Sequence, residues 1–263
     1  MTSETAPDGR VGQVIENAQD LRVARDLRIA QDLREVITRA ECVLFDFDGP
    51  ICRLYANHDA QTVVDNLVGW LADRGEVGLL TADERDSADP HAVLRAVHRA
   101  RPGSPLEADL EARLTEEELH AAARAFPTPY VDRLIRTWHA GGARLAVATN
   151  NAPEAARHYV HGRGVADCFG PHIHGRRTEH VHALKPDPDC LHRALGSLGA
   201  HPSRTLMIGD TPADCLAARE AGVAFLGYGQ DELRQKKLRS AGAEHVVDSL
   251  GTVLKAVWAG ALL

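Results

Sequence analysis

Asp46 and Asp48 stand two residues apart after the apolar run CVLF, and this pair is the part of the sequence best suited to do chemistry. In an extended chain, side chains two residues apart point to the same side, so both carboxyl groups can approach one reacting group. One carboxylate can attack while the other protonates the leaving group. The pair is therefore suited to hydrolysis in two displacements.

Further polar residues stand where other apolar runs stop. Thr149 and Asn150 follow one run, Asp210 and Asp214 follow another, and Lys185 lies between them in the segment LKPDP. Each residue alone has an ordinary explanation, as a helix N-cap, a turn or a surface lysine. Their joint occurrence favours one shared site, because open α/β sheets bind ligands at the carboxyl ends of their strands.

The apolar runs themselves have the length and composition of buried strands. Segments of helical composition separate them, and two of these segments open with Pro at the expected first turn. This alternation predicts an α/β fold with a Rossmann-like parallel sheet and helices on both faces. The predicted strands are CVLFDF (42–47), RLAVAT (144–149), TLMIGD (205–210), VAFLGY (223–228) and HVV (245–247).

The interval between the first two strands is too long for one crossover connection. It has an all-helical pattern, and we predict that residues 55–141 form an inserted helical cap over the site, while 41–54 and 142–263 form the catalytic core. A surface insertion without function is the alternative. The helices are expected at 59–73, 90–100, 107–125 and 129–140.

Four segments resemble the signature motifs of the haloacid dehalogenase superfamily, in the order of that family: DFDGP (46–50), TNN (149–151), KPDP (185–188) and GDTPAD (209–214). The resemblance covers residues 41–250, and the helical interval is similar to the first-position cap of phosphoglycolate phosphatase-like members. One departure is Pro50, where the family most often has Thr. Proline fixes the local backbone and removes an amide donor, but no catalytic side chain is lost.

The resemblance implies that Asp46 is the nucleophile, which becomes an aspartyl-phosphate, and that Asp48 is the general acid and base. It also implies a Mg²⁺ ion that keeps the carboxylate and the phosphate from repelling one another. The expected ligands are the Asp46 side chain, the Asp48 main-chain carbonyl and Asp210, with Asp214 binding directly or through water.

The same resemblance assigns the remaining positions to the phosphoryl group. Lys185 is expected to pair with Asp46 and with the phosphoryl oxygens. The hydroxyl of Thr149 and the main-chain amide of Asn150 would hold the other phosphoryl oxygens, and Gly49 lets the backbone turn sharply beside them.

We therefore expect a magnesium-dependent phosphatase that acts on a small phosphorylated metabolite. Asp48 argues against dehalogenase and phosphonatase activity, because those members of the superfamily replace the second acidic residue. The Lys-Thr-Gly sequence that follows the nucleophile of transport ATPases is missing here. A phosphomutase acting on a sugar phosphate stays open, and so does a noncatalytic binding module that recruits partners through an N-terminal helix.

Composition limits the classes of binding partner and the cellular compartment that we expect for the protein. The chain has 37 acidic and 30 basic residues, a net charge of -7 that disfavours nucleic acid. Its five cysteines are dispersed without a CxxC pair, which indicates reduced thiols and a cytoplasmic protein. No apolar stretch suggests a signal peptide or a membrane span.

The first 40 residues are expected to lie outside the core, with 1–14 as a disordered tail. A DLR repeat follows at Asp20, Asp26 and Asp32, and its period of six predicts an exposed helical lead-in, or else a partner-binding helix.

Three other groups of residues have alternative interpretations. The segment QKKLR (235–239) is interpreted as a solvated helix face. Four histidines would be candidates for a transition-metal site: His172, His174, His180 and His182. Four arginines could contact a second anionic group of the substrate from the cap: Arg53, Arg95, Arg99 and Arg101.

Overall fold

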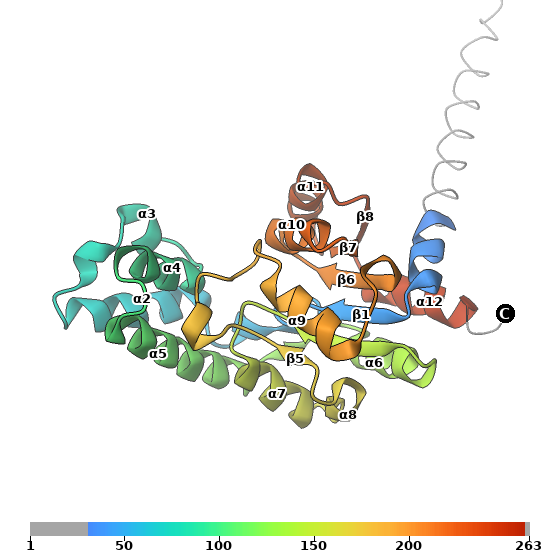
Figure 1. The fold of residues 1–263 in the computed structure, drawn as a ribbon, viewed down its shortest axis with the longest axis horizontal. Helices are drawn as coiled ribbons and strands as arrows, with labels where there is room; N and C mark the ends of the chain where they lie inside the picture. The colour runs from blue at the N-terminus through green and yellow to red at the C-terminus, as the bar shows by residue number, and fades with distance from the viewer. Residues whose placement is uncertain (1–30, 261–263) are drawn as a thin grey trace, which may run out of the picture.

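The computed structural model describes residues 31–260. The predicted tail and the DLR copies at Asp20 and Asp26 lie outside this part of the chain. Within it, the chain forms a central parallel sheet, helices on both faces of the sheet, and an inserted group of helices beyond one end of the sheet (Figure 1). The predicted α/β fold class, a Rossmann-like core with a helical cap, is confirmed.

Six parallel strands form the sheet in the order β5-β4-β1-β6-β7-β8. Their bounds are β1 Cys42–Phe45, β4 Arg144–Ala148, β5 Ile173–His174, β6 Thr205–Gly209, β7 Ala224–Tyr228 and β8 His245–Val247. All of them except β5 lie within the apolar runs that predict strands. β5 was missed because a strand of two residues is too short to show a periodic pattern.

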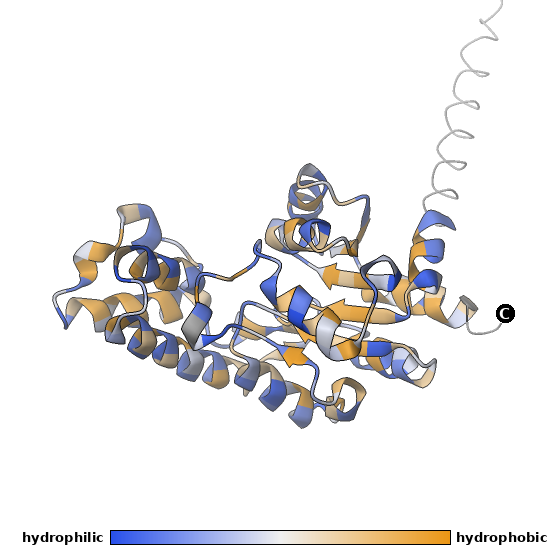
Figure 2. Cartoon of the chain, viewed as in Figure 1, coloured by the Kyte–Doolittle hydropathy of each residue, from blue (hydrophilic) through white to orange (hydrophobic). Residues whose placement is uncertain are grey.

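The first strand is buried on both of its faces, as its unbroken apolar run predicts. Val43 and Phe45 belong to one apolar cluster, while Cys42 and Leu44 belong to a second cluster. Figure 2 shows the strands mainly in the apolar colour, whereas the helices alternate between apolar and polar residues. Both faces of the sheet are therefore covered by amphipathic helices.

One face is covered by α6 (Val131–Ala140), α7 (Pro153–Gly162), α8 (Ala166–Phe169) and α12 (Leu250–Gly260), whose apolar side chains share a cluster with the sheet. The other face is covered by α9 (Asp189–Leu198), α10 (Pro212–Glu220) and α11 (Glu232–Ser240). Two short 3-10 helices, Thr178–His180 and Pro202–Arg204, complete this part of the chain. None of the helices within residues 31–260 has the length and apolar character needed to cross a membrane.

The inserted helices are α2 (Ala60–Ala72), α3 (Ala82–Arg85), α4 (Pro90–Ala100) and α5 (Pro105–Ala122), with 3-10 helices at Leu54–Ala56 and Val77–Leu79. They have an apolar core of their own, which includes Val63, Leu67, Leu94, Leu110 and Leu114. In Figure 1 the arrowheads of β1 and β6 point toward this cap. The cap therefore stands over the carboxyl ends of the strands.

Two details of residues 55–141 differ from the predicted helical pattern. β3 (Phe126–Pro127) interrupts the helices and pairs antiparallel with β2 (Cys52–Arg53), so the two connections between cap and core run side by side. The last helix of the interval, α6, packs against α12 and β4. Its buried residues join the cluster of the sheet instead of the cluster of the cap.

The described end of the helical lead-in is partly buried, whereas an exposed helix was expected. Residues 31–39 are helical, and Leu33 and Ile37 belong to the apolar cluster of the sheet. These two residues are four apart and share one face of the helix. The third DLR copy, at Asp32, therefore contributes its leucine to the core.

Candidate active site

The register of the sheet brings the carboxyl ends of β1, β4 and β6 together. Phe45 of β1 pairs with Val147 of β4 and with Ile208 of β6. The amide of Asp46 donates a hydrogen bond to Ile208 O at 2.9 Å. Because β1 lies between β4 and β6, Asp46 lies between the residues that follow these two strands.

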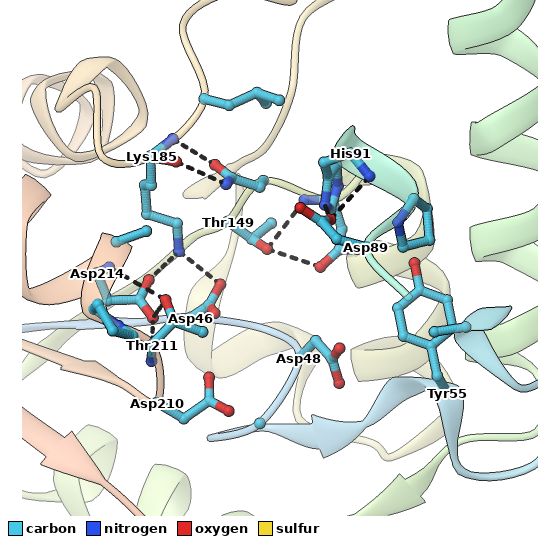
Figure 3. Close-up of a pocket in the computed structure, with 18 of the residues that line it drawn as sticks. Asp46, Asp48, Tyr55, Asp89, His91, Thr149, Lys185, Asp210, Thr211 and Asp214 are labelled. Atoms are coloured by element: carbon cyan, nitrogen blue, oxygen red, sulfur yellow. Dashed lines mark hydrogen bonds and ion pairs between the residues drawn. The ribbon is translucent and has the colours of Figure 1, made fainter. Parts of the chain in front are cut away.

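All of the predicted site residues line one cleft of about 1270 Å³ between the core and the cap (Figure 3). They are Asp46, Asp48, Gly49, Thr149, Asn150, Lys185, Asp210 and Asp214. Four segments that are distant in the sequence thus converge: three of them follow strands, and the segment of Lys185 reaches the cleft from the connection that leads into α9. The volume of the cleft is ample for a small phosphorylated molecule.

Lys185 supplies the positive charge at the centre of the site. Its Nζ lies 2.8 Å from Asp46 Oδ1, forms a second ion pair with Asp214, and donates to Ala148 O at 3.0 Å. Burial alone would lower the pKa of Lys185, but Asp214 and Asp46 outweigh burial and raise it above its ordinary value. The side chain is therefore a fixed cation beneath the cleft.

Three largely buried carboxylates lie beside this cation, and a second cation, the half-exposed Arg234, pairs with one of them, Asp210, at 3.3 Å. Oxygen atoms of Asp46, Asp210 and Asp214 all lie within 4.8 Å of one another. Asp210 Oδ1 is buried and has no hydrogen-bond partner among the described residues, and Asp46 Oδ1 has only its ion pair with Lys185. Burial and the neighbouring carboxylates raise the pKa of Asp46 and of Asp210, although Lys185 opposes the shift of Asp46. Excess negative charge beside a buried carboxylate oxygen that lacks a partner is what a hard divalent cation binds, so the residues fit a metal ion.

Asp214 is already committed to other partners. It stands in the first turn of α10, where its side chain accepts from the amide and the hydroxyl of Thr211 while its own amide donates to that hydroxyl. Its other carboxylate oxygen accepts from Lys185. This arrangement combines the N-terminal helix cap that the sequence suggests with a place in the acidic cluster.

Gly49 is required by its closeness to Asp210. Its φ of +111° is a backbone conformation that other residues rarely adopt. A Cβ atom at this position would lie 2.3 Å from Asp210 Cγ. Any side chain here would displace the carboxylate, so this glycine allows the loop after β1 to pass against the acidic cluster.

Asp48 points away from the acidic cluster and toward the cap in Figure 3. Its Oδ1 accepts a hydrogen bond from Leu54 N at 2.8 Å. Burial raises the pKa of Asp48 to about 7, helped by the charge of Asp46 and opposed by the Leu54 amide. The side chain can therefore carry a proton near neutral pH, and its predicted metal contact is the main-chain carbonyl instead.

Thr149 and Asn150 follow β4 and line the cleft. The Thr149 hydroxyl donates to Asn151 Oδ1 at 3.0 Å and accepts from Asn151 N at 3.2 Å. The Asn150 side chain accepts from Lys185 N at 2.7 Å, which ties this loop to the segment that carries the lysine. The sequence predicted the two residues but not the hydrogen bonds that hold them.

Sequence reasoning missed a buried polar group behind this loop. Arg176, which follows β5, contacts Glu111 and Glu118 of α5, and His91 of α4 lies 3.3 Å from Glu118. One signal was available: Glu118 stands four residues after Leu114, on the buried stripe of its helix. A charged residue on such a stripe predicts a buried partner.

Two of the four candidate arginines, Arg53 and Arg95, line the cap side of the cleft. Arg95 pairs with Asp89 at 2.6 Å, whereas Arg53 has no carboxylate partner within residues 31–260. Arg99 and Arg101 do not line the cleft, because they pair with Glu84 and Glu76 on the cap. The hydroxyl of Tyr55, which lines the same wall, is buried without a hydrogen-bond partner in the described part of the chain.

The four candidate histidines form two separate pairs. His172 and His174 both contact Ser197 Oγ, at 3.0 and 2.7 Å. His180 and His182 contact one another at 5.7 Å between ring centroids. Among residues 31–260, the three aspartates described above are the only group whose ligand atoms converge as a metal site requires. The transition-metal alternative therefore has no support here.

Comparison with known proteins agrees with this geometry. The family described as haloacid dehalogenase-like hydrolase matches residues 40–222. This range contains all of the predicted site residues and the whole cap.

Two relatives of named activity are similar to the chain over most of their length. A phosphoglycolate phosphatase from Rhodospirillum rubrum is 30% identical over 81% of this chain and 89% of its own length. An N-acetylmuramic acid 6-phosphate phosphatase from Pseudomonas aeruginosa is also 30% identical, over 73% of this chain and 83% of its own length.

Solved structures share the fold. CbbY from Rhodobacter sphaeroides, in complex with phosphate, has a TM-score of 0.60 at 24% identity and covers 81% of this chain and 96% of its own. A haloacid dehalogenase-like protein from Agrobacterium tumefaciens has a TM-score of 0.57 at 19% identity, over 85% of this chain and 100% of its own.

Proposed function

The chain belongs to the haloacid dehalogenase-like hydrolase family, and from this premise we propose that it is a magnesium-dependent phosphatase that hydrolyses a small phosphomonoester through an aspartyl-phosphate on Asp46. The observation that carries the proposal is the buried contact of Asp46 with Lys185 beside two further carboxylates, Asp210 and Asp214. Lys185 and the half-exposed Arg234 do not balance three acids, and the remaining negative charge fits a site completed by a divalent ion.

The proposed Mg²⁺ would be held by the side chains of Asp46 and Asp210 and by the main-chain carbonyl of Asp48. Asp214 would support the site less directly, because Lys185 and Thr211 already occupy its carboxylate oxygens. When bound, the ion supplies positive charge that lets a carboxylate approach a phosphate dianion. Residues of the chain carry out the attack on phosphorus, the proton transfers and the binding of the phosphoryl oxygens.

In the first displacement, a carboxylate oxygen of Asp46 attacks the phosphorus atom and forms the acyl phosphate. The bond between phosphorus and the ester oxygen breaks, and its electron pair goes to the leaving alkoxide. Asp48, in its protonated form, gives that oxygen its proton and the alcohol departs. Lys185 stays charged throughout and faces the oxygens of Asp46, where it offsets the negative charge of the transferring group.

In the second displacement, a water molecule attacks the phosphorus of the acyl phosphate. Asp48, now ionised, takes a proton from this water, and the bond between phosphorus and Asp46 breaks. Orthophosphate leaves and the Asp46 carboxylate is restored, so the chain returns to its starting state. The Thr149 hydroxyl and the Asn150 amide hold the phosphoryl oxygens in both displacements.

We propose a small phosphorylated metabolite as the substrate, because the two named relatives are phosphatases of such compounds. Arg53 and Tyr55 line the wall that the leaving group would face. The guanidinium of Arg53 suits a second anionic group, and the Tyr55 hydroxyl suits a hydroxyl or a carboxylate. All five cysteines are free thiols, which supports a reducing cytoplasmic compartment.

The test is a screen of the purified protein with Mg²⁺ against phosphorylated metabolites, with Asp46→Asn as the matched variant. We expect the wild type to release phosphate and the parent alcohol from at least one compound, and Asp46→Asn to release none. A wild type that is inert toward the whole panel would refute the proposal. An isomerised sugar phosphate as the product would identify a phosphomutase instead.

A further inference from the structure

The guanidinium of Arg176 is a fully buried cation that joins the core to the cap. Its Nε lies 3.0 Å from Glu111 Oε1, and its Nη1 and Nη2 donate to the two carboxylate oxygens of Glu118 at 3.0 Å each. The side chains of Arg176 and Glu118 are both 0% exposed. The fork of Arg176 thus holds Glu118 in one orientation.

Both residues of this pair also form hydrogen bonds with the loop that follows β4. Arg176 Nη1 donates to Asn150 O at 3.0 Å. Glu118 accepts from Asn151 Nδ2 at 2.9 Å and from Ala152 N at 2.7 Å. Asn151 in turn accepts from the Thr149 hydroxyl. Each residue from 149 to 152 is therefore fixed directly, or through one neighbour, by the same ion pair.

The local sequence does not provide these contacts by itself. Ala152 is the N-cap of α7 and has no side chain able to cap the helix. Glu118 brings a negative charge to this helix N-terminus from a different element, where the helix dipole favours it. The carboxylate of Glu118, from the inserted helices, thus takes the place of an N-capping side chain at α7 and fixes the end of the loop.

We infer that Glu118 and Arg176 are positioning residues that hold Thr149 and Asn150 in place to bind the phosphoryl group. The inference rests on the proposed function for the role of that loop. A buried ion pair is weak evidence of stability, since apolar residues of similar volume often replace one without loss. What apolar residues cannot supply is the set of directed hydrogen bonds to the loop.

The first test compares two adjacent carboxylates of α5. Glu118→Gln should lower kcat/KM by about 10²-fold, because small displacements of groups that hold the substrate have effects of this size. Inhibition by inorganic phosphate should weaken as well. The matched control is Glu117→Gln, whose carboxylate is also largely buried but contacts His58 and Asn66 within the cap. This control should keep the kcat/KM of the wild type.

The second test separates positioning from stability. The triple variant Glu111→Leu, Glu118→Leu and Arg176→Met removes Arg176 together with both of its carboxylate partners, so it should regain thermal stability relative to the double variant Glu111→Leu with Glu118→Leu, in which the buried Arg176 has lost both partners. The triple variant should not regain kcat/KM, because the loop has lost its hydrogen bonds. Recovery of both quantities in the triple variant would overturn the inference.

Amide hydrogen exchange over residues 149–152 gives a readout that does not depend on turnover. Exchange should be faster in Glu118→Gln than in the wild type, and unchanged in Glu117→Gln. Equal exchange in all three proteins would contradict the positioning role even if the wild type is an active phosphatase. A wild type without phosphatase activity, but with faster exchange in Glu118→Gln, would contradict the proposed function and leave the loop contacts supported.

Discussion

Asp46 and Asp48 lie two residues apart, but their surroundings differ. Asp46 faces the ammonium group of Lys185 at 2.8 Å, whereas Asp48 accepts one hydrogen bond from a backbone amide. Burial raises the pKa of Asp48 to about 7, and no cation pairs with it within 4 Å in the described residues. Two carboxyl groups with such different partners are suited to different roles, one as nucleophile and one as acid and base.

The acid role of Asp48 predicts a dependence on the leaving group. Asp48→Asn should lower kcat/KM for alkyl phosphates by about 10²- to 10⁴-fold, the range typical of a lost general acid. Aryl phosphates should lose less, because their phenolate leaves without a proton. Steady-state kinetics on matched alkyl and aryl esters provide the measurement, and equal losses on both would contradict the role.

Gly49 is the residue at which the backbone itself limits substitution. Gly49→Ala places a Cβ where Asp210 Cγ lies 2.3 Å away, at a φ of +111°. We expect a loss of about 1–3 kcal/mol in the free energy of unfolding from the strained backbone, and weaker Mg²⁺ binding. Chemical denaturation and Mg²⁺ titration measure the two effects. Gly75→Ala, which is at positive φ with open space around it, is the control for the backbone alone.

At the scale of elements, the strands were predictable because both faces of the sheet are buried. β1, β4 and β6 appear in the sequence as apolar runs, and a polar residue stands where each run ends. The cap helices α2, α4 and α5 begin within two residues of their predicted starts. Asp89-Pro90 and Ser104-Pro105 mark two of these starts, with the Asp and the Ser as N-caps.

Elements that depend on contacts distant in sequence could not be predicted. β2 and β3 are two residues each, and their pairing follows from the return of the chain from cap to core. The contact of Glu118 with Asn151 spans 33 residues, and no local pattern encodes it. The period of six in the DLR repeat distributes its leucines around the helix and so predicts an exposed helix. Leu33 and Ile37, however, are four residues apart and form the buried face of the helix over 31–39.

The contacts of α5 predict how stability depends on pH. Burial would raise the pKa of Glu118, but Arg176 and His91 outweigh burial and lower it to about 2, below its ordinary value of 4.5. As the pH falls, Glu118 is therefore protonated in the unfolded chain before it is protonated in the folded protein. Its stabilising contribution is complete above pH 4.5 and is lost between pH 4.5 and 2. Denaturation of the wild type and of Glu118→Gln should give free energies of unfolding that converge over this interval. A difference that stays constant there would contradict the shift.

The whole molecule is a core and a cap that share one cleft, and the strand ends bring acids from the core to its floor. Sequence reasoning located this floor because the residues follow strands. It could not give the shape of the cap wall, since Arg53 at the end of β2 and Tyr55 in the 3-10 helix that follows belong to no motif.

Metal binding should stabilise the whole protein. A ligand that binds only the folded state at 100 times its Kd adds about 2.7 kcal/mol to the free energy of unfolding. Mg²⁺ should therefore raise the thermal midpoint, and chelation should reverse the rise. Asp210→Asn should abolish this response, whereas Glu154→Gln, which changes an exposed carboxylate on α7, should keep it. An equal response in Asp210→Asn would place the ion elsewhere.

The central claim, that Asp46 carries the phosphoryl group, can be tested by trapping. The wild type is mixed with Mg²⁺ and a substrate from the screen, quenched, and reduced with borohydride, which converts an aspartyl-phosphate to homoserine. Peptide mass spectrometry should then find homoserine at position 46 in the wild type and nowhere in Asp46→Asn. Turnover of the substrate with an unmodified Asp46, or with homoserine at another aspartate, would contradict the account.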